Sequence, residues 1–177
     1  MRLVNITIVL IFLFLISSVP LACGCGSVKI PDPELEAVIR EAINKTEGAI
    51  LVSELEGLTS LNASGSNIGD LSGLEYCMNL TSLDLDENQI SDISPLASLT
   101  KLTELHLSGN QITDVSPLVS LTNLELLLLS ENQISDIAPL ASLMNLEYLR
   151  LFINPLSSTS IEVYIPQLEE RGVDVKW

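Results

Sequence analysis

Leucine, isoleucine and asparagine recur along this chain at a fixed spacing of 22 residues. Three consecutive units share the pattern x-L-x-x-L-x-L-x-x-N-x-I-x-D-I/V-x-P-L-x-x-L-x, and they span Asn79–Thr100, Lys101–Thr122 and Asn123–Met144. A weaker copy, Gly57–Met78, precedes them, and a truncated copy, Asn145–Leu156, follows. A unit this short has no core of its own, so it must bury its apolar side chains against its neighbours. The pattern therefore predicts a stack of coils.

The order of residues within the unit predicts where the chain is extended and where it turns. The L-x-L segment alternates apolar and polar side chains, which indicates a short strand with one face inward. The inward positions of the first full unit are expected to be Leu80, Leu83, Leu85, Ile90, Ile93, Leu96 and Leu99. The asparagine after the strand should lie inside the turn, because its amide offers two donors and an acceptor to the backbone. This column holds Asn88, Asn110, Asn132 and Asn154. Ser66 takes its place in the weak copy, whose coil should be the least regular.

A column of aspartates follows the asparagines. Its members are Asp70, Asp92, Asp114 and Asp136. Each precedes a segment such as Ile93–Leu96, where a carboxylate caps the free N–H groups of a helical turn. A calcium-binding row is the functional alternative, but calcium needs several oxygens that converge on one point. Capping explains all four aspartates, so we expect no metal site.

The 22-residue unit resembles the leucine-rich repeat. This resemblance implies an α/β fold class: a solenoid with short parallel strands on its concave face, a helical N-terminal cap and a helix–strand C-terminal cap. The expected organisation is an export or lipoprotein-type segment over 1–24, a tether and helical cap over 25–56, repeats over 57–155 and a second cap over 156–177.

Capping signals support both flanking segments. Asp32 is a good helix N-cap, and Pro33 suits the first helical position. At the other end, a helix capped by Ser157–Ser160 should run to about Arg171. The alternation that follows predicts a last strand whose inward side chains are Val173, Val175 and Trp177.

The first 24 residues are typical of an export segment. Arg2 precedes an apolar run over residues 3–16, and small residues follow. The segment Leu21–Cys25 resembles a bacterial lipoprotein signal, in which Cys25 fits lipidation best and Cys23 is the alternative. Cleavage by an ordinary signal peptidase and retention as an uncleaved membrane anchor both stay open. The expected location is outside the cytoplasm, either secreted or held at the cell surface.

The charge of the chain restricts its partners. It holds 23 acidic and 8 basic residues and has a net charge of −15. Nucleic acid and anionic lipid headgroups need basic surface, so neither is expected to bind. The chain has no phosphate loop, zinc signature or dinucleotide fingerprint, and we expect no cofactor. Cys77 occupies a leucine position of the repeat and should be a core residue.

The outward positions of the strands form three columns across the coils. They grade from hydroxyls and carboxylates at the N-terminal end to Leu, Tyr, Phe and Arg at the C-terminal end. Exposed aromatic, Leu and Arg side chains beside acids resemble a binding hot spot. The candidate ligand-binding residues are Glu104, His106, Leu126, Leu128, Tyr148, Arg150 and Phe152. Coverage of this face by the C-terminal helix, or by a second copy of the chain, is the alternative.

A catalytic set is the other reading of the same face. His106 is the single histidine, with Asp84 in its column and Ser108 two residues along. Such a set needs a pocket and an oxyanion hole, and flat, open strand positions supply neither. An ordinary surface pair of Asp and His is the simpler account, so the chain is not expected to be an enzyme.

Two repeats carry a more specific resemblance. The segments Asn88–Thr100 and Asn132–Leu143, with N-Q-I-S-D-I-S/A-P-L-A-S-L in common, resemble repeats of bacterial internalin-like proteins. The resemblance implies surface display and a protein or peptide ligand on the concave face. It does not extend to host-cell invasion, because the further domains and sorting tail of internalins are not visible. A self-associating envelope component and a glycan-binding module are the alternative functions.

Overall fold

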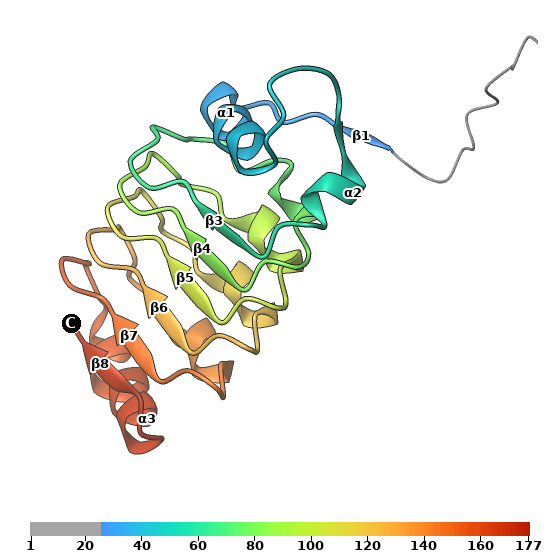
Figure 1. Ribbon diagram of the computed structural model, residues 1–177. Coiled ribbons are helices and arrows are strands. Elements are labelled where there is room, and N and C mark those ends of the chain that lie inside the picture. Colours follow the sequence, from blue (N-terminus) through green and yellow to red (C-terminus); the bar gives the residue numbers. More distant parts are fainter. Residues whose placement is uncertain (1–25) are drawn as a thin grey trace, which may run out of the picture.

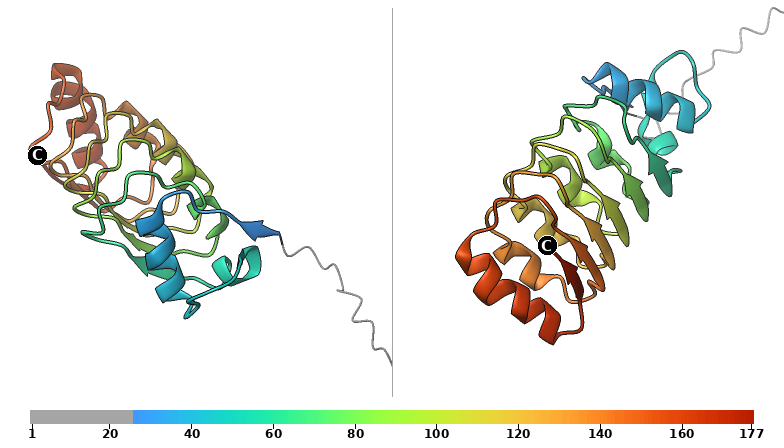
Figure 2. Two further views of the ribbon diagram at one scale, coloured as in Figure 1. Left: turned by 90° about the horizontal axis from the view of Figure 1, so that it is seen from above. Right: turned by 90° about the vertical axis from the view of Figure 1, so that its left-hand side faces the viewer.

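The coils of the chain stack along one axis. The computed structural model describes residues 26–177, and the predicted leader with Cys23 and Cys25 lies outside them. Strands β3 to β8 form one side of the stack, and short helical turns form the opposite side (Figures 1 and 2). Within the described residues, no helix is long and apolar enough to cross a membrane.

Six short parallel strands form the main sheet, in the order β3-β4-β5-β6-β7-β8. They are β3 (Ser60–Asn62), β4 (Ser82–Asp84), β5 (Glu104–His106), β6 (Leu126–Leu128), β7 (Tyr148–Arg150) and β8 (Asp174–Lys176). The opposite side carries the 3-10 turns η1 (Leu74–Tyr76), η2 (Ser94–Ser98), η3 (Ser116–Ser120) and η4 (Ala138–Ser142). Equivalent positions of successive repeats pair directly, as Leu83 does with Leu105. The predicted parallel solenoid is confirmed.

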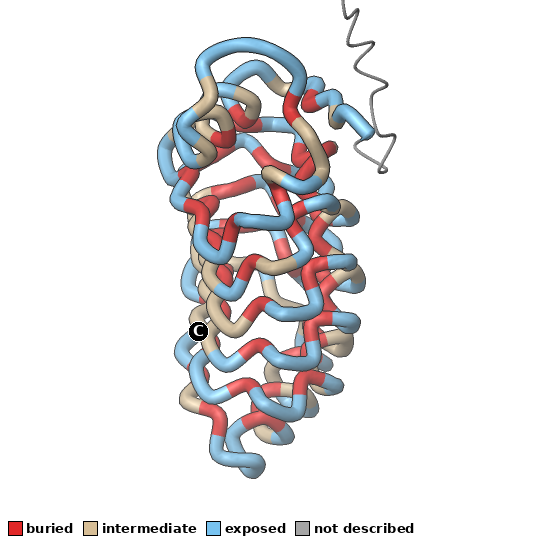
Figure 3. The backbone as a smooth tube through the Cα atoms, turned by 45° about the vertical axis from the view of Figure 1, so that its right-hand side comes forward, coloured by how far each residue is buried: buried red, intermediate tan, exposed pale blue. Residues whose placement is uncertain are grey.

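Leucine and isoleucine fill the space between the two sides. Each inward residue predicted for the first full repeat, from Leu80 to Leu99, is at most 1% exposed. In Figure 3, buried segments (red) recur in each coil along the stack. Cys77 is fully buried in its leucine position, as predicted, and burial raises the pKa of its thiol to about 12.

The asparagines join neighbouring coils. The amide nitrogen of Asn88 donates to the backbone oxygens of Ala63 (2.9 Å) and Leu85 (3.0 Å), and its Oδ1 accepts from the N–H of Ile68 (2.9 Å). Asn110, Asn132 and Asn154 repeat this arrangement. Each amide therefore satisfies backbone groups that the turn leaves without partners, as expected. The first coil, which has Ser66, carries the shortest of the four 3-10 turns.

The aspartate column caps the turns. Asp92 Oδ1 accepts from the N–H of Ser94 at 2.8 Å, immediately before η2. Asp70, Asp114 and Asp136 accept from the N–H two residues further on in the same way. The capping interpretation is confirmed for Asp92, Asp114 and Asp136, which hold the first N–H of η2, η3 and η4. The N–H that Asp70 holds lies two residues before η1.

The N-terminal cap contains α1 (Pro33–Ala42) and α2 (Val52–Leu55), with β1 (Ser27–Val28) antiparallel to β2 (Ile50–Leu51). Asp32 caps α1 as predicted, since its Oδ1 accepts from the N–H groups of Glu34 and Leu35. Residues 26–30 were expected to be only a tether, but they belong to the cap. Ile30 is buried, and a Cβ added to Gly73 would lie 2.9 Å from its Cγ1. The absence of a side chain at Gly73 is what lets this segment pack on the first coil.

The C-terminal cap starts with the π-helical segment η5 (Ser160–Tyr164), which continues into α3 (Ile165–Glu170). Ser157 Oγ accepts from the N–H of Ser160, and the chain leaves the helix through Gly172 at φ 92°. Strand β8 then pairs in parallel with β7. Val173 and Val175 are buried as predicted, but Trp177 is 52% exposed. The prediction for Trp177 was wrong because β8 ends at Lys176, so Trp177 lies outside the paired strand.

Candidate functional site

The outward side chains of the sheet form the columns that the repeat predicts. The first column runs Ser60, Ser82, Glu104, Leu126, Tyr148, Asp174. The second runs Asn62, Asp84, His106, Leu128, Arg150, Lys176. Strand β8 adds Asp174 and Lys176, which were predicted as outward charges but not as part of this face. The signal for their place was the alternation of residues 173–177, which continues the strand pattern beyond the last repeat.

The C-terminal part of the face is apolar. Tyr148 and Phe152 are each 46% exposed, and Leu126 and Leu128 beside them are partly exposed. The C-terminal helix does not cover these side chains, because it packs on the end of the stack (Figure 1). We refer to Leu126, Leu128, Tyr148 and Phe152 as the apolar patch. Exposed side chains of this kind, held on rigid strands, are suited to contact a partner.

Arg150 is less available to a binding partner than its outward position suggests. Its guanidinium donates to the backbone oxygen of Asp174 at 2.7 Å and to the Asp174 carboxylate at 2.8 Å. Lys176 also pairs with this carboxylate. Hydrogen bonds lower the pKa of Asp174, and the one from Lys176 contributes more than the one from Arg150. Arg150 thus ties β7 to β8 and forms the polar border of the apolar patch.

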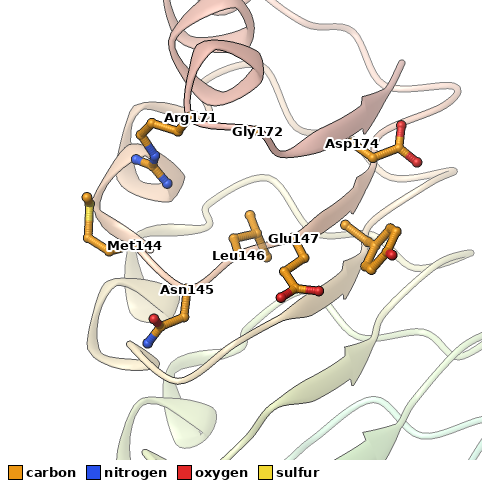
Figure 4. A pocket seen from close by; sticks show the side chains of 8 residues that line it. Met144, Asn145, Leu146, Glu147, Arg171, Gly172 and Asp174 are labelled. Carbon is orange, nitrogen blue, oxygen red and sulfur yellow. The ribbon is translucent and has the colours of Figure 1, made fainter.

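An open hollow lies beside the patch, between the last repeat and the C-terminal cap (Figure 4). Glu147 and Asp174 present carboxylates along it, and Tyr148 and Met144 contribute apolar surface. Arg171 closes the opposite end, where its guanidinium donates to the backbone oxygens of residues 141 and 143. Because the Asp174 carboxylate is already paired with Arg150 and Lys176, the Tyr148 ring and the Glu147 carboxylate are the groups of this hollow that favour a cationic side chain.

The N-terminal half of the face is polar and acidic. Glu104 Oε1 lies 3.0 Å from His106 Nε2, and Glu104 Oε2 accepts from the hydroxyl of Ser82. Asp86 Oδ1 accepts from the N–H of Ser108 at 2.6 Å. Burial, reinforced by the nearby Asp84 carboxylate, raises the pKa of Asp86. Asp84 and Asp86 were not among the predicted ligand-binding residues, and Asp84 entered only as a member of the catalytic alternative.

A nucleophilic triad is not assembled. His106 contacts Glu104 and approaches Asp86, and among the described residues no hydrogen bond joins it to Ser108. The surroundings are an open sheet surface, without the paired donors that would stabilise an oxyanion. The arrangement is therefore suited to binding rather than to acyl transfer.

Comparison with known proteins agrees with the geometry. The family described as leucine-rich repeats (2 copies) matches residues 56–98, 78–120, 100–128 and 122–164. No curated protein sequence matches the chain.

Two solved structures show the likeness in three dimensions. An internalin (inlF) from Listeria monocytogenes is 39% identical, with a TM-score of 0.74 over 82% of this chain and 42% of that one. A leucine-rich-repeat protein from Leptospira interrogans is 26% identical, with a TM-score of 0.57 over 70% of this chain and 38% of that one. The chain thus spans less than half the length of these relatives. With its repeats, parallel sheet and outward columns, it belongs to the leucine-rich-repeat family and is an internalin-like bacterial leucine-rich-repeat protein.

Proposed function

We propose that this protein is exported, is held at the cell surface or secreted, and binds a protein or peptide on its concave face. The apolar patch carries the proposal. Four large apolar side chains stand on neighbouring positions of β6, β7 and the turn after β7, and two of them are 46% exposed. A soluble monomer rarely leaves such side chains together on a rigid surface unless they contact something.

Charge and size define the partner further. The carboxylates of Glu104, Glu125 and Glu147 line a hollow beside Leu126 and Tyr148 of the apolar patch, so basic residues of a partner would find opposite charge there. The Asp174 carboxylate is already paired with Arg150 and Lys176. Six strands spaced by about 4.8 Å give a face about 24 Å long. At about 16 Å wide it offers roughly 400 Å², about half of what one partner contributes to a stable interface. The partner is therefore an extended basic peptide segment, or a protein bound weakly.

Surface tethering would compensate for weak single contacts. Many copies on one surface raise the effective concentration for a multivalent partner. Lipidation at Cys25, with Cys23 as the alternative, would supply the tether. Mass spectrometry of the N-terminal peptide from membranes checks this part separately. A free, unmodified N-terminus on a cleaved and released protein would contradict it.

Substitution of the two aromatic side chains tests the binding function. Cross-linking on intact source cells, with identification of the captured species by mass, should give a partner for the wild-type protein. Tyr148→Ala combined with Phe152→Ala should reduce capture at least tenfold, because aromatic hot spots each contribute about 2 kcal/mol or more. The melting temperature should barely change, because both rings are nearly half exposed.

Tyr76→Ala provides the matched control. Tyr76 is 40% exposed and ends η1 on the opposite side of the coils. Its removal should leave capture intact. Equal loss of capture in the two variants, or unchanged capture by the double variant, would show that the apolar patch is not the binding surface.

Self-association is the second candidate. Large exposed apolar residues gather towards the C-terminal end of the stack, where Met144 is 71%, Ile153 76% and Trp177 52% exposed. A second copy of the chain would cover them. Light scattering over a concentration series distinguishes the two functions. Growth to oligomers in the wild type, abolished in the double variant, would favour self-association. A constant monomer mass would favour a foreign partner.

A further inference from the structure

Three potential metal ligands converge on the concave face next to the apolar patch, since His106 pairs with Leu128. Asp84 and His106 are paired across β4 and β5, and Asp86 follows two residues after Asp84. One ligand atom from each side chain lies within 4.8 Å of the other two. All three side chains are partly buried, and they come from two adjacent coils.

This cluster is not a by-product of the repeat. The corresponding positions one coil earlier are Asn62, Ser64 and Asp84, and those one coil later are His106, Ser108 and Leu128. The capping aspartates, in contrast, recur in every coil and hold the turns. Asp84 Oδ1 accepts from the N–H two residues further on, as the capping aspartates do and as Asn62 does one coil earlier. That role explains one oxygen of Asp84, but it does not explain why Asp84, Asp86 and His106 lie together.

The imidazole of His106 is oriented towards the two aspartates. Its Nε2 lies 3.0 Å from Glu104 Oε1, and a carboxylate offers only acceptors, so Nε2 carries the hydrogen. The lone pair of the neutral ring is then on Nδ1, which lies 4.0 Å from Asp86 Oδ2. Metal-bound histidines in proteins share this arrangement, in which a carboxylate holds one ring nitrogen and the metal takes the other.

The charge of the cluster also favours a cation. Asp86 Oδ1 accepts a hydrogen bond from the N–H of Ser108, and Asp84 Oδ1 accepts one from the N–H of Asp86. Neither carboxylate forms an ion pair with lysine or arginine among residues 26–177.

We propose that Asp84, Asp86 and His106 bind one transition-metal dication, with zinc as the preferred ion, through His106 Nδ1 and one oxygen of each aspartate. A mixed set of imidazole and carboxylate ligands suits zinc better than calcium or magnesium, which favour oxygen alone. Small rotations of the aspartates would bring the ligand atoms to about 3.3 Å from one another, the separation in a tetrahedral zinc site. The fourth position is open to water. The bound ion would brace β4 against β5, and the proposal does not depend on the partner of the apolar patch.

Titration of the chelator-stripped protein with Zn²⁺ by calorimetry tests the site. One zinc ion per chain should bind, and it should raise the melting temperature of the protein because it binds only the folded state. Glu104→Gln should weaken zinc binding by about tenfold, since it removes the charge of the group that orients His106 and keeps an oxygen that can accept from Nε2. His106→Gln and Asp86→Asn remove ligands and should each weaken it by more than Glu104→Gln does.

Glu125→Gln is the matched control, because it removes the same charge from an exposed residue next to β6 and leaves the cluster intact. It should bind zinc like the wild type. Circular dichroism of each metal-free variant verifies folding. Co²⁺ should give the visible absorption of a tetrahedral site in the wild type and not in His106→Gln.

Three results would overturn the proposal. One is the absence of saturable binding at one ion per chain. Another is equal affinity for Zn²⁺ in wild type and His106→Gln. The third is binding of Ca²⁺ or Mg²⁺ as tight as that of Zn²⁺, which would show unspecific attraction to an acidic surface.

Discussion

One residue in each coil has a backbone conformation that the repeat pattern does not predict. The residue immediately before the turn asparagine, or before its substitute Ser66, has a positive φ in all five coils. These residues are Gly65 (63°), Glu87 (56°), Gly109 (68°), Glu131 (55°) and Ile153 (57°). The left-handed conformation turns the chain out of the strand and aims the next side chain into the coil. It costs a residue with a side chain about 1–2 kcal/mol, and glycine avoids this cost.

Ile153→Gly should therefore stabilise the protein. Isoleucine is the least suitable of the five residues, because its branched side chain crowds a left-handed backbone. It is 76% exposed and loses little packing when removed. We expect a gain of about 1 kcal/mol and a rise in melting temperature of about 2–4 °C, measured by thermal unfolding. Ile153→Ala should gain much less, since alanine still has a Cβ. A lower melting temperature for Ile153→Gly than for Ile153→Ala would contradict this account.

At the scale of single residues, the sequence predicts those columns in which every full repeat has the same type of side chain. Asn88 and Asp92 recur without exception in the full repeats, so their roles could be deduced by aligning the chain with itself. The left-handed position carries Gly in two coils and Glu or Ile in three, so composition gives no consistent signal. The Asp84–Asp86–His106 cluster was missed for the same reason, because it occurs once and depends on contacts between two coils.

At the scale of elements, one carboxylate connects the N-terminal cap to the repeats. Asp32 Oδ1 caps α1, and its Oδ2 accepts from the N–H groups of Gly69 (2.9 Å) and Asp70 (3.1 Å) in the first coil. The helix cap could be predicted from Asp32 and Pro33, which are adjacent in sequence. The bonds to the first coil could not, because they span 37 and 38 residues.

Asp32→Ala should cost about 2 kcal/mol at neutral pH, since it removes a helix cap and two further charge-assisted hydrogen bonds. Burial alone would raise the pKa of Asp32, but the four backbone N–H donors outweigh it and lower the pKa. The contribution to stability is therefore fully present above the unfolded value of about 3.9, and it is lost as the pH falls through the lower folded value.

Urea unfolding over a pH series measures this effect. The difference in unfolding free energy between wild type and Asp32→Ala should be constant at neutral pH and shrink in the acid range. Glu47→Ala, which changes an exposed carboxylate of the same cap, should stay within about 0.5 kcal/mol of the wild type throughout. A difference between wild type and Asp32→Ala that persists unchanged in acid would mean that the charge of Asp32 is not what matters.

At the scale of the whole molecule, stability should be local, because each coil contacts only its neighbours. The repeats are joined by the asparagine ladder and by paired strands. The C-terminal cap continues the strand pairing through β8, and Ser160 and two arginines add hydrogen bonds to the last repeat. Arg150 holds β8 to β7, and Arg171 reaches from the end of α3 to the backbone of residues 141 and 143. The sequence predicted a helix and a strand here, but Arg171 appeared only as the end of the helix.

Arg171→Ala should release the C-terminal cap without unfolding the repeats. The variant loses two hydrogen bonds from a charged donor, and we expect the free energy of local opening to fall by about 2 kcal/mol. Hydrogen exchange should then accelerate about 30-fold in residues 160–177 and remain unchanged in β4 and β5. Lys101→Ala is the control, because Lys101 donates only to the exposed side chain of Asn79. Faster exchange along the entire sheet would mean that the coils open as one unit, and the nearest-neighbour description of the stack would have to be abandoned.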